Sequence, residues 1–199
     1  MKKVLLSALT IGLFLLTGCG FVGGREEHAA LLLQEEYGAL TACTMEAQVR
    51  YDDGFEVTDY SLSCAWTPEK SEIEILEPEL LAGITAEVDP TTMKLVYGDL
   101  SLPVGKSEQE GLSPATVLPQ LMQVVREGYL LEQGVEKLDG SDCVKLVFDP
   151  PEELGNYTCV LWFGKDHAPL RGEIYQEGTM CFGVDFSTFS AKIEEKTEA

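Results

Sequence analysis

The chain has 199 residues, with 34 acidic and 14 basic side chains and a formal net charge of −20 at pH 7. This charge disfavours nucleic acid as a partner, because the phosphate backbone would be repelled. The length suits a single domain that buries a substantial core.

The N-terminus carries the pattern of an export signal. Lys2 and Lys3 precede an apolar run over residues 4–16, which is short for a membrane span. The run ends in Leu16-Thr17-Gly18-Cys19, which resembles the bacterial lipoprotein signal. In that signal the cysteine is diacylated on sulfur and becomes the mature N-terminus. An ordinary secretory signal with an incidental cysteine is the alternative.

The lipoprotein interpretation predicts how the chain is divided and where it works. Residues 1–18 would be the signal peptide, residues 19–25 the lipidated cysteine and a spacer that contains glycine, and residues 26–199 one domain. We expect the protein to be held on the extracytoplasmic side of the cell membrane by acyl chains such as palmitate, since two chains suffice for stable anchoring.

A helix and a hairpin open the predicted domain. Residues 26–37 place apolar side chains at helical spacing, and residues 42–66 form two strands around Asp53-Gly54, a strong turn signal. A two-residue loop there would pair Cys43 with Cys64 and Met45 with Leu62, and it would place Met45, Ala47 and Val49 along one mainly apolar face. We therefore predict a Cys43–Cys64 disulfide, with two reduced thiols in the core as the alternative.

The cysteine count leaves at least one thiol unpaired. Five of the six cysteines remain when Cys19 is lipidated, which is an odd number in a compartment that permits disulfides. A link between Cys143 and Cys159 stays open, and Cys181 fits best as a free, buried thiol.

The rest of the chain predicts short strands around one helix. The predicted strands are residues 72–76, 84–88, 93–97, 143–148, 157–163, 170–175 and 179–186. The helix is predicted at residues 114–127, with Ser113 as N-cap, Pro114 at the first helical position and Gly128 as the stop. Apolar side chains cover more than half of its circumference, so we expect a sheet that curves around it.

This order of elements resembles the LolA-like lipoprotein-carrier superfamily, which includes germination lipoproteins of the GerS type. The segments that carry the resemblance are residues 68–78, Gly83-Ile84, Leu161-Trp162-Phe163 and Ala168-Pro169-Leu170. The resemblance implies a mainly β fold with α-helices, in which an unclosed antiparallel half-barrel sheet has helices over its concave face. It also implies that this face can hold acyl chains, and that some members instead act by binding a cell-wall enzyme.

Two functions fit these expectations. In the first, the concave face binds an acyl chain, a lipid or a lipoprotein, and the candidate lining residues are Met45, Leu62, Ile73, Ile75, Met93, Leu95, Leu118, Leu121, Met122 and Val125. The alternative is that these side chains simply pack on one another as ordinary core. In the second, the filled half-barrel binds or senses an envelope protein. A cavity beneath the helix at 114–127 would favour the first function, and close packing the second.

The sequence offers little support for catalysis. The two histidines, His28 and His167, lack metal-ligand spacing and are expected to face solvent. The chain contains no HExxH, GxSxG, P-loop or CxxC motif. We therefore predict no cofactor, no metal site and no enzymatic activity.

Overall fold

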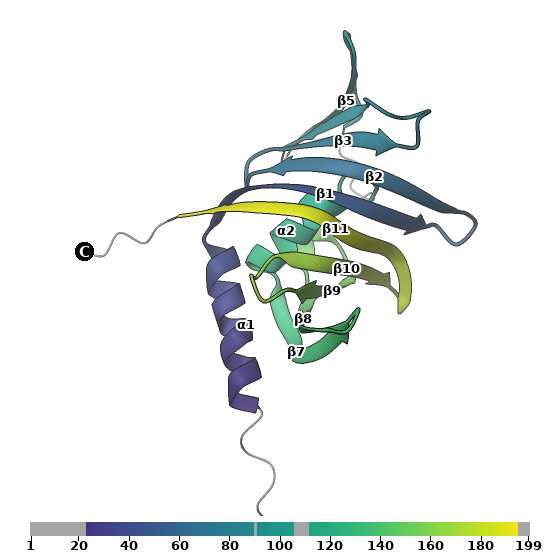
Figure 1. The fold of residues 1–199 in the computed structure, drawn as a ribbon. Coiled ribbons are helices and arrows are strands. Elements are labelled where there is room, and N and C mark those ends of the chain that lie inside the picture. The colour runs from purple at the N-terminus through teal and green to yellow at the C-terminus, as the bar shows by residue number, and fades with distance from the viewer. Residues whose placement is uncertain (1–22, 90, 106–111, 195–199) are drawn as a thin grey trace, which may run out of the picture.

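The computed structural model of the chain describes residues 23–89, 91–105 and 112–194 (Figure 1). The predicted signal peptide and Cys19 lie outside these residues. The elements in chain order are α1 (Gly23–Gly38), β1 (Leu40–Asp52), β2 (Val57–Trp66), β3 (Ser71–Glu77), β4 (Thr85–Val88), β5 (Met93–Tyr97), β6 (Leu100–Pro103), α2 (Val117–Glu127), β7 (Tyr129–Leu138), β8 (Ser141–Asp149), a short 3₁₀ helix (Glu152–Leu154), β9 (Thr158–Phe163), β10 (Pro169–Gln176) and β11 (Thr179–Ile193).

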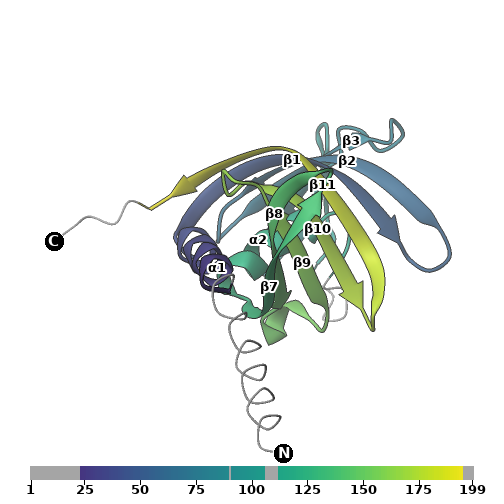
Figure 2. The same cartoon turned by 60° about the horizontal axis from the view of Figure 1, so that its bottom comes forward.

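All eleven strands belong to one antiparallel sheet that does not close. The strand order is β6-β5-β4-β3-β2-β1-β11-β10-β9-β8-β7, so β6 and β7 are its two edges. Pairing of β1 with β11 joins the N-terminal meander to the C-terminal one. The sheet curves, and both helices lie within the curve (Figure 2). The predicted mainly β fold, an unclosed sheet with helices on its concave side, is confirmed.

The first hairpin confirms the predicted faces and corrects the predicted register. Asp53 Oδ1 accepts hydrogen bonds of 2.8 Å from the backbone N–H groups of Phe55 and Glu56, which closes a four-residue loop instead of a two-residue turn. Every pair is displaced by two residues, so Cys43 lies opposite Trp66. A shift of two keeps each side chain on its predicted face, because side chains alternate with a period of two.

The predicted disulfide between Cys43 and Cys64 is wrong in this structure, where both thiols are free and buried. Cys64 lies opposite Met45, so the two cysteines are diagonal neighbours on one face. Diagonal partners are farther apart than directly opposite ones, and usually too far for a bridge.

The thiols of Cys143, Cys159 and Cys181 are also free. Cys143 packs with Val147 and Trp162 on the convex side of the sheet, whereas Cys159 lies in the main core on the concave side. Because the two cysteines lie on opposite faces of the sheet, they do not form a disulfide with each other. Cys181 is free, as predicted, but it is only half-buried.

Both helices begin at residues other than those predicted. α2 starts at Val117 and not at Pro114, because Thr116 and Val117 both donate backbone hydrogen bonds to the Ser113 carbonyl and form a separate turn. Its end before Gly128 is as predicted. α1 starts at Gly23, inside the predicted spacer, because the first turn of a helix does not require the apolar spacing used to find it.

Candidate interaction surface

The central part of the concave face is filled by α2. This helix packs against α1, β2 and β8, with its apolar side chains directed into the main core. Leu121 comes especially close to the sheet, since a Cβ placed on Gly172 of β10 would lie 3.1 Å from Leu121 Cδ1. The glycine therefore allows the helix to approach the strands.

The predicted lining residues fall into two groups. Those that are at most 3% exposed and belong to the main core are Met45, Leu62, Ile73, Leu118, Leu121, Met122 and Val125. The other three, Ile75, Met93 and Leu95, are half-buried and lie toward the β6 edge of the sheet. The first group forms packed core, and the second continues the same face away from α2.

The concave face of β5 and β6 is apolar and largely uncovered. Its side chains form a surface that we name the apolar ledge, consisting of Met93, Leu95, Tyr97, Leu100, Leu102 and Val104. Cross-strand pairing continues the face outward from the buried Ala86 to Leu95 and then to Leu102. Exposure rises along this row, from 3% at Ala86 to 64% at Leu102. Leu100, which pairs with Tyr97 on the same face, is 73% exposed.

The opposite face of these strands is charged. Glu87 accepts ion pairs from Lys70 at 2.8 Å and from Lys94 at 3.1 Å. These contacts hold the pKa of the Glu87 carboxyl below its ordinary value, with the hydrogen bond from Lys70 as the largest cause. Glu87 and Lys94 therefore face away from the ledge, on the side of the sheet that also carries Thr85 and Val96.

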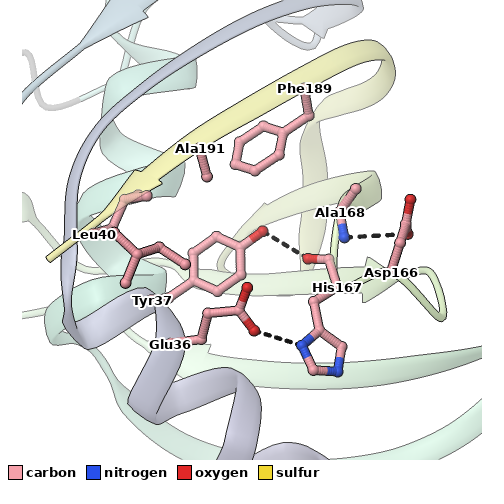
Figure 3. A pocket seen from close by; sticks show the side chains of 9 residues that line it. Glu36, Tyr37, Leu40, Asp166, His167, Ala168, Phe189 and Ala191 are labelled. Atoms are coloured by element: carbon pink, nitrogen blue, oxygen red, sulfur yellow. Dashed lines mark hydrogen bonds and ion pairs between the residues drawn. The ribbon is translucent and has the colours of Figure 1, made fainter. Parts of the chain in front are cut away.

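A small pocket lies where the C-terminal end of α1 meets the turn between β9 and β10 (Figure 3). Its volume is about 180 Å³. The Tyr37 hydroxyl donates a 2.8 Å hydrogen bond to the carbonyl of His167, and the His167 ring is bonded to the Glu36 carboxylate. Burial raises the pKa of Tyr37. His167 thus fastens α1 to the sheet and does not simply face solvent as predicted, whereas His28 is exposed.

A second hollow lies over β1, β2 and β11. Small side chains, including Ala42, Ala65 and Ser190, leave a space of about 520 Å³ that is open to solvent. Lys70, Glu72 and Lys192 also line it. It is shallow, so it does not enclose a ligand in the way that small-molecule sites do.

The described part of the chain offers no obvious catalytic or metal centre. Within it, no group of three or more His, Cys, Asp or Glu side chains is placed to hold a metal ion. None of the helices in that part is long and apolar enough to cross a membrane. Burial raises the pKa of Cys43 to about 12, and it raises the pKa of Cys159 as well, which keeps these thiols protonated and poorly nucleophilic.

The comparisons with known proteins return distant structures. No protein-family model matches the chain, and no curated protein matches it by sequence. A DUF1329 family protein from Desulfovibrio piger is 17% identical, with 87% of this chain and 94% of that chain covered and a TM-score of 0.49. The LolA superfamily protein NE2245 from Nitrosomonas europaea is 10% identical, with 83% and 94% covered and a TM-score of 0.48.

A third solved structure is the CwlD amidase from Clostridioides difficile in complex with the GerS lipoprotein. The matching chain is 17% identical, with 84% of this chain and 96% of that chain covered and a TM-score of 0.44. At these identities the similarities concern the fold and not the function. A LolA-superfamily protein is thus one of the solved structures to which this chain is similar.

Proposed function

We propose that this protein is an extracytoplasmic lipoprotein, anchored through Cys19, whose folded body is a non-catalytic module for binding another envelope protein. The observation that carries the proposal is the filled concave face. Leu118, Leu121 and Met122, which the sequence predicts to line an acyl-chain site, are fully buried. A ligand at that position would have to displace α2. We therefore place binding on the exposed surfaces of the body.

The exposed surfaces suit a protein partner better than a small ligand. Small-molecule sites usually enclose most of the ligand, whereas Tyr97, Leu100 and Leu102 are each at least 60% exposed. Contiguous exposed apolar residues with a polar surround are typical of protein interaction sites. The acidic surface adds a preference for partners with basic residues.

The position of α1 supports a body held near the membrane. The helix begins at Gly23, and the four residues from Cys19 to that point span at most about 14 Å when extended. The net charge of −20 opposes contact between the body and an anionic leaflet. Its surfaces would therefore stay available to proteins close to the membrane.

Anchoring is tested by metabolic labelling with a palmitate analogue in a bacterial host that processes lipoproteins. The wild-type protein should be labelled and sediment with membranes, whereas a Cys19→Ala variant should lose the label. Cys181→Ala is the matched control, because it removes a half-buried thiol that the proposal does not place in the anchor. Equal labelling of the wild-type protein and Cys19→Ala would contradict the anchor.

The choice between protein and lipid binding is tested by organic extraction of protein purified from its own host. Extraction releases a non-covalent lipid and leaves the covalent acyl group on the chain. We expect no lipid in stoichiometric amount in the extract, since the helix-covered interior is packed. One releasable lipid per chain would reject the interaction module in favour of an acyl-binding protein.

A further inference from the structure

The apolar ledge is a continuation of the core for which the described chain supplies no cover. Ile73 is 1% exposed and Ala86 is 3% exposed, while Leu102 in the same cross-strand row is 64% exposed. α2 has 11 residues and is about 16 Å long, and its contacts in the sheet include β2, β8 and β10. One helix of this size covers only part of a face that eleven strands make.

The segments outside the described residues that follow β6 are poorly suited to cover the ledge. Residues 106–111 read Lys-Ser-Glu-Gln-Glu-Gly, and residues 195–199 read Glu-Lys-Thr-Glu-Ala. Neither segment contains a leucine, isoleucine, valine, methionine or aromatic side chain, so neither can bury apolar area of this size. A cover for the ledge must come from elsewhere.

The charges around the ledge favour a basic occupant. Residues 71–105 contain seven acidic side chains and one basic side chain, Lys94. Cross-strand pairing places Lys94 on the face opposite the ledge together with Glu72, Glu74 and Glu87. The other four acidic residues, which no basic residue of this range accompanies, are Glu77, Glu79, Asp89 and Asp99. Lys94 is already paired with Glu87 on the opposite face. A second copy of this chain would bring another charge of −20 to the contact, so self-association is opposed.

The geometry favours a helix over a strand as the occupant. β6 has only four residues and ends in Pro103, which lacks a backbone N–H, so this edge offers few hydrogen bonds to an added strand. The same concave face already accepts an apolar helix at α2. An amphipathic helix can lay its apolar side on such a surface through side chains alone.

From these observations we infer that the apolar ledge is the docking face for an amphipathic helix with a basic polar side, carried by a partner protein. This inference rests on the proposed interaction function and assigns it a site. The apolar side of the helix covers Leu100 and Leu102, and its basic residues face the acidic residues around the ledge.

The test uses the chain from residue 20 to 199, which retains every described residue, and synthetic peptides of about 18 residues. The first peptide places leucine along one helical side and lysine elsewhere. The second replaces each lysine by glutamate. The third keeps the composition and charge of the first but distributes its leucines around the helix. Binding is measured by isothermal titration calorimetry, and the site is located by amide chemical shifts.

We expect the first peptide to bind, with shifts centred on residues 93–104, and the other two to bind at least about ten-fold more weakly. The variant Leu100→Ser/Leu102→Ser should also lose about ten-fold in affinity. Leu131→Ser is the matched control, because Leu131 is 57% exposed but lies on β7 at the other edge. It should bind within about two-fold of wild type.

Four results would overturn the inference. Equal binding of the third peptide would show that charge alone is recognised, and equal binding of the second would remove the basic requirement. Unchanged binding by Leu100→Ser/Leu102→Ser would place the site elsewhere. A dimer in analytical ultracentrifugation that this variant dissociates would assign the ledge to a second copy.

This test and the lipid extraction can fail separately. If no peptide binds and no lipid is extracted, the site is wrong while the interaction function stands. If a stoichiometric lipid is extracted, the function itself fails, and the peptide result shows whether that lipid occupies the ledge.

Discussion

The two parts of the concave face differ in what covers them, although their sequences follow the same rule. In β1, Met45, Ala47 and Val49 alternate with exposed residues and are at most 2% exposed. In β6, Leu100 and Leu102 alternate with Ser101 in the same way, yet both leucines are mostly exposed. Alternation therefore specifies which face a side chain occupies, and a covering element specifies whether it is buried.

The two parts of the concave face are also expected to have different roles, one in the stability of the fold and the other in binding a partner. Side chains beneath α2 contribute to folding because their apolar area is removed from water. Ledge side chains contribute little to folding, since most of their area stays in water in the folded state. Their apolar area is removed from water only when a partner covers them, so they contribute to the free energy of binding. The same substitution should therefore affect stability in the covered part and binding on the ledge.

The largest expected effect is that of Leu121→Ala in the covered part. Leu121 is fully buried and contacts the sheet at Gly172, so its truncation leaves a cavity and should lower the free energy of unfolding by about 3–5 kcal/mol. The matched control is Leu102→Ala on the ledge, which should change it by less than about 1 kcal/mol. Both are measured by urea denaturation, and equal losses would break the comparison.

The next effect is a loss of stability at alkaline pH that originates in the covered part. Burial raises the pKa of Cys43 from 9.0 to about 12 and also raises the pKa values of Cys64, Cys159 and Tyr157. The folded state holds these protons more tightly, so their stabilisation is full below pH 9 and declines as the pH rises toward 12.

The measurement is the unfolding midpoint between pH 8 and pH 12. A Cys43→Ala variant, although less stable overall, should lose less between these limits than wild type does. Tyr97→Phe on the ledge is the control and should follow the wild-type profile. A Cys43→Ala profile parallel to that of wild type would contradict burial as the cause.

A smaller effect is expected where α1 is fastened to the sheet. Tyr37→Phe removes the hydrogen bond from the hydroxyl to the His167 carbonyl but keeps the ring contact with Phe163, whose centroid is 5.3 Å away. The free energy of unfolding should fall by about 1 kcal/mol, measured by urea denaturation. Tyr97→Phe, with a ring that is 60% exposed, should have no measurable effect. If both substitutions lowered the free energy of unfolding equally, the loss could not be assigned to the hydrogen bond between Tyr37 and His167.

The smallest effect is expected from Glu87→Gln on the charged face behind the ledge. The Glu87 carboxyl has a pKa below its ordinary value of 4.5, so its pairing stabilises the fold above that pH and the effect disappears as the pH falls. Melting temperatures at pH 7 should differ slightly between the variant and wild type, and those at pH 3 should coincide. A large difference at pH 7 would mean that this exposed network matters more than surface ion pairs usually do.

The sequence by itself determined the faces of the strands and the apolar character of α2. Period-two alternation assigned Met45 and Cys64 to one face even though the register was wrong, because a displacement of two preserves the face. The excess of apolar residues from Val117 to Val125 required an enclosed helix, and the helix is enclosed. These features are local, so a short window of sequence contains them.

Only the tertiary structure decided the register, the fate of the thiols and the part of the sheet that α2 covers. The register depends on hydrogen bonds of the Asp53 side chain, and it separates Cys43 from the position opposite Cys64. The exposure of Leu102 depends on where one short helix lies along an eleven-stranded sheet. Leu62 and Leu102 belong to the same kind of apolar alternation, and only the three-dimensional position of α2 makes one core and the other surface.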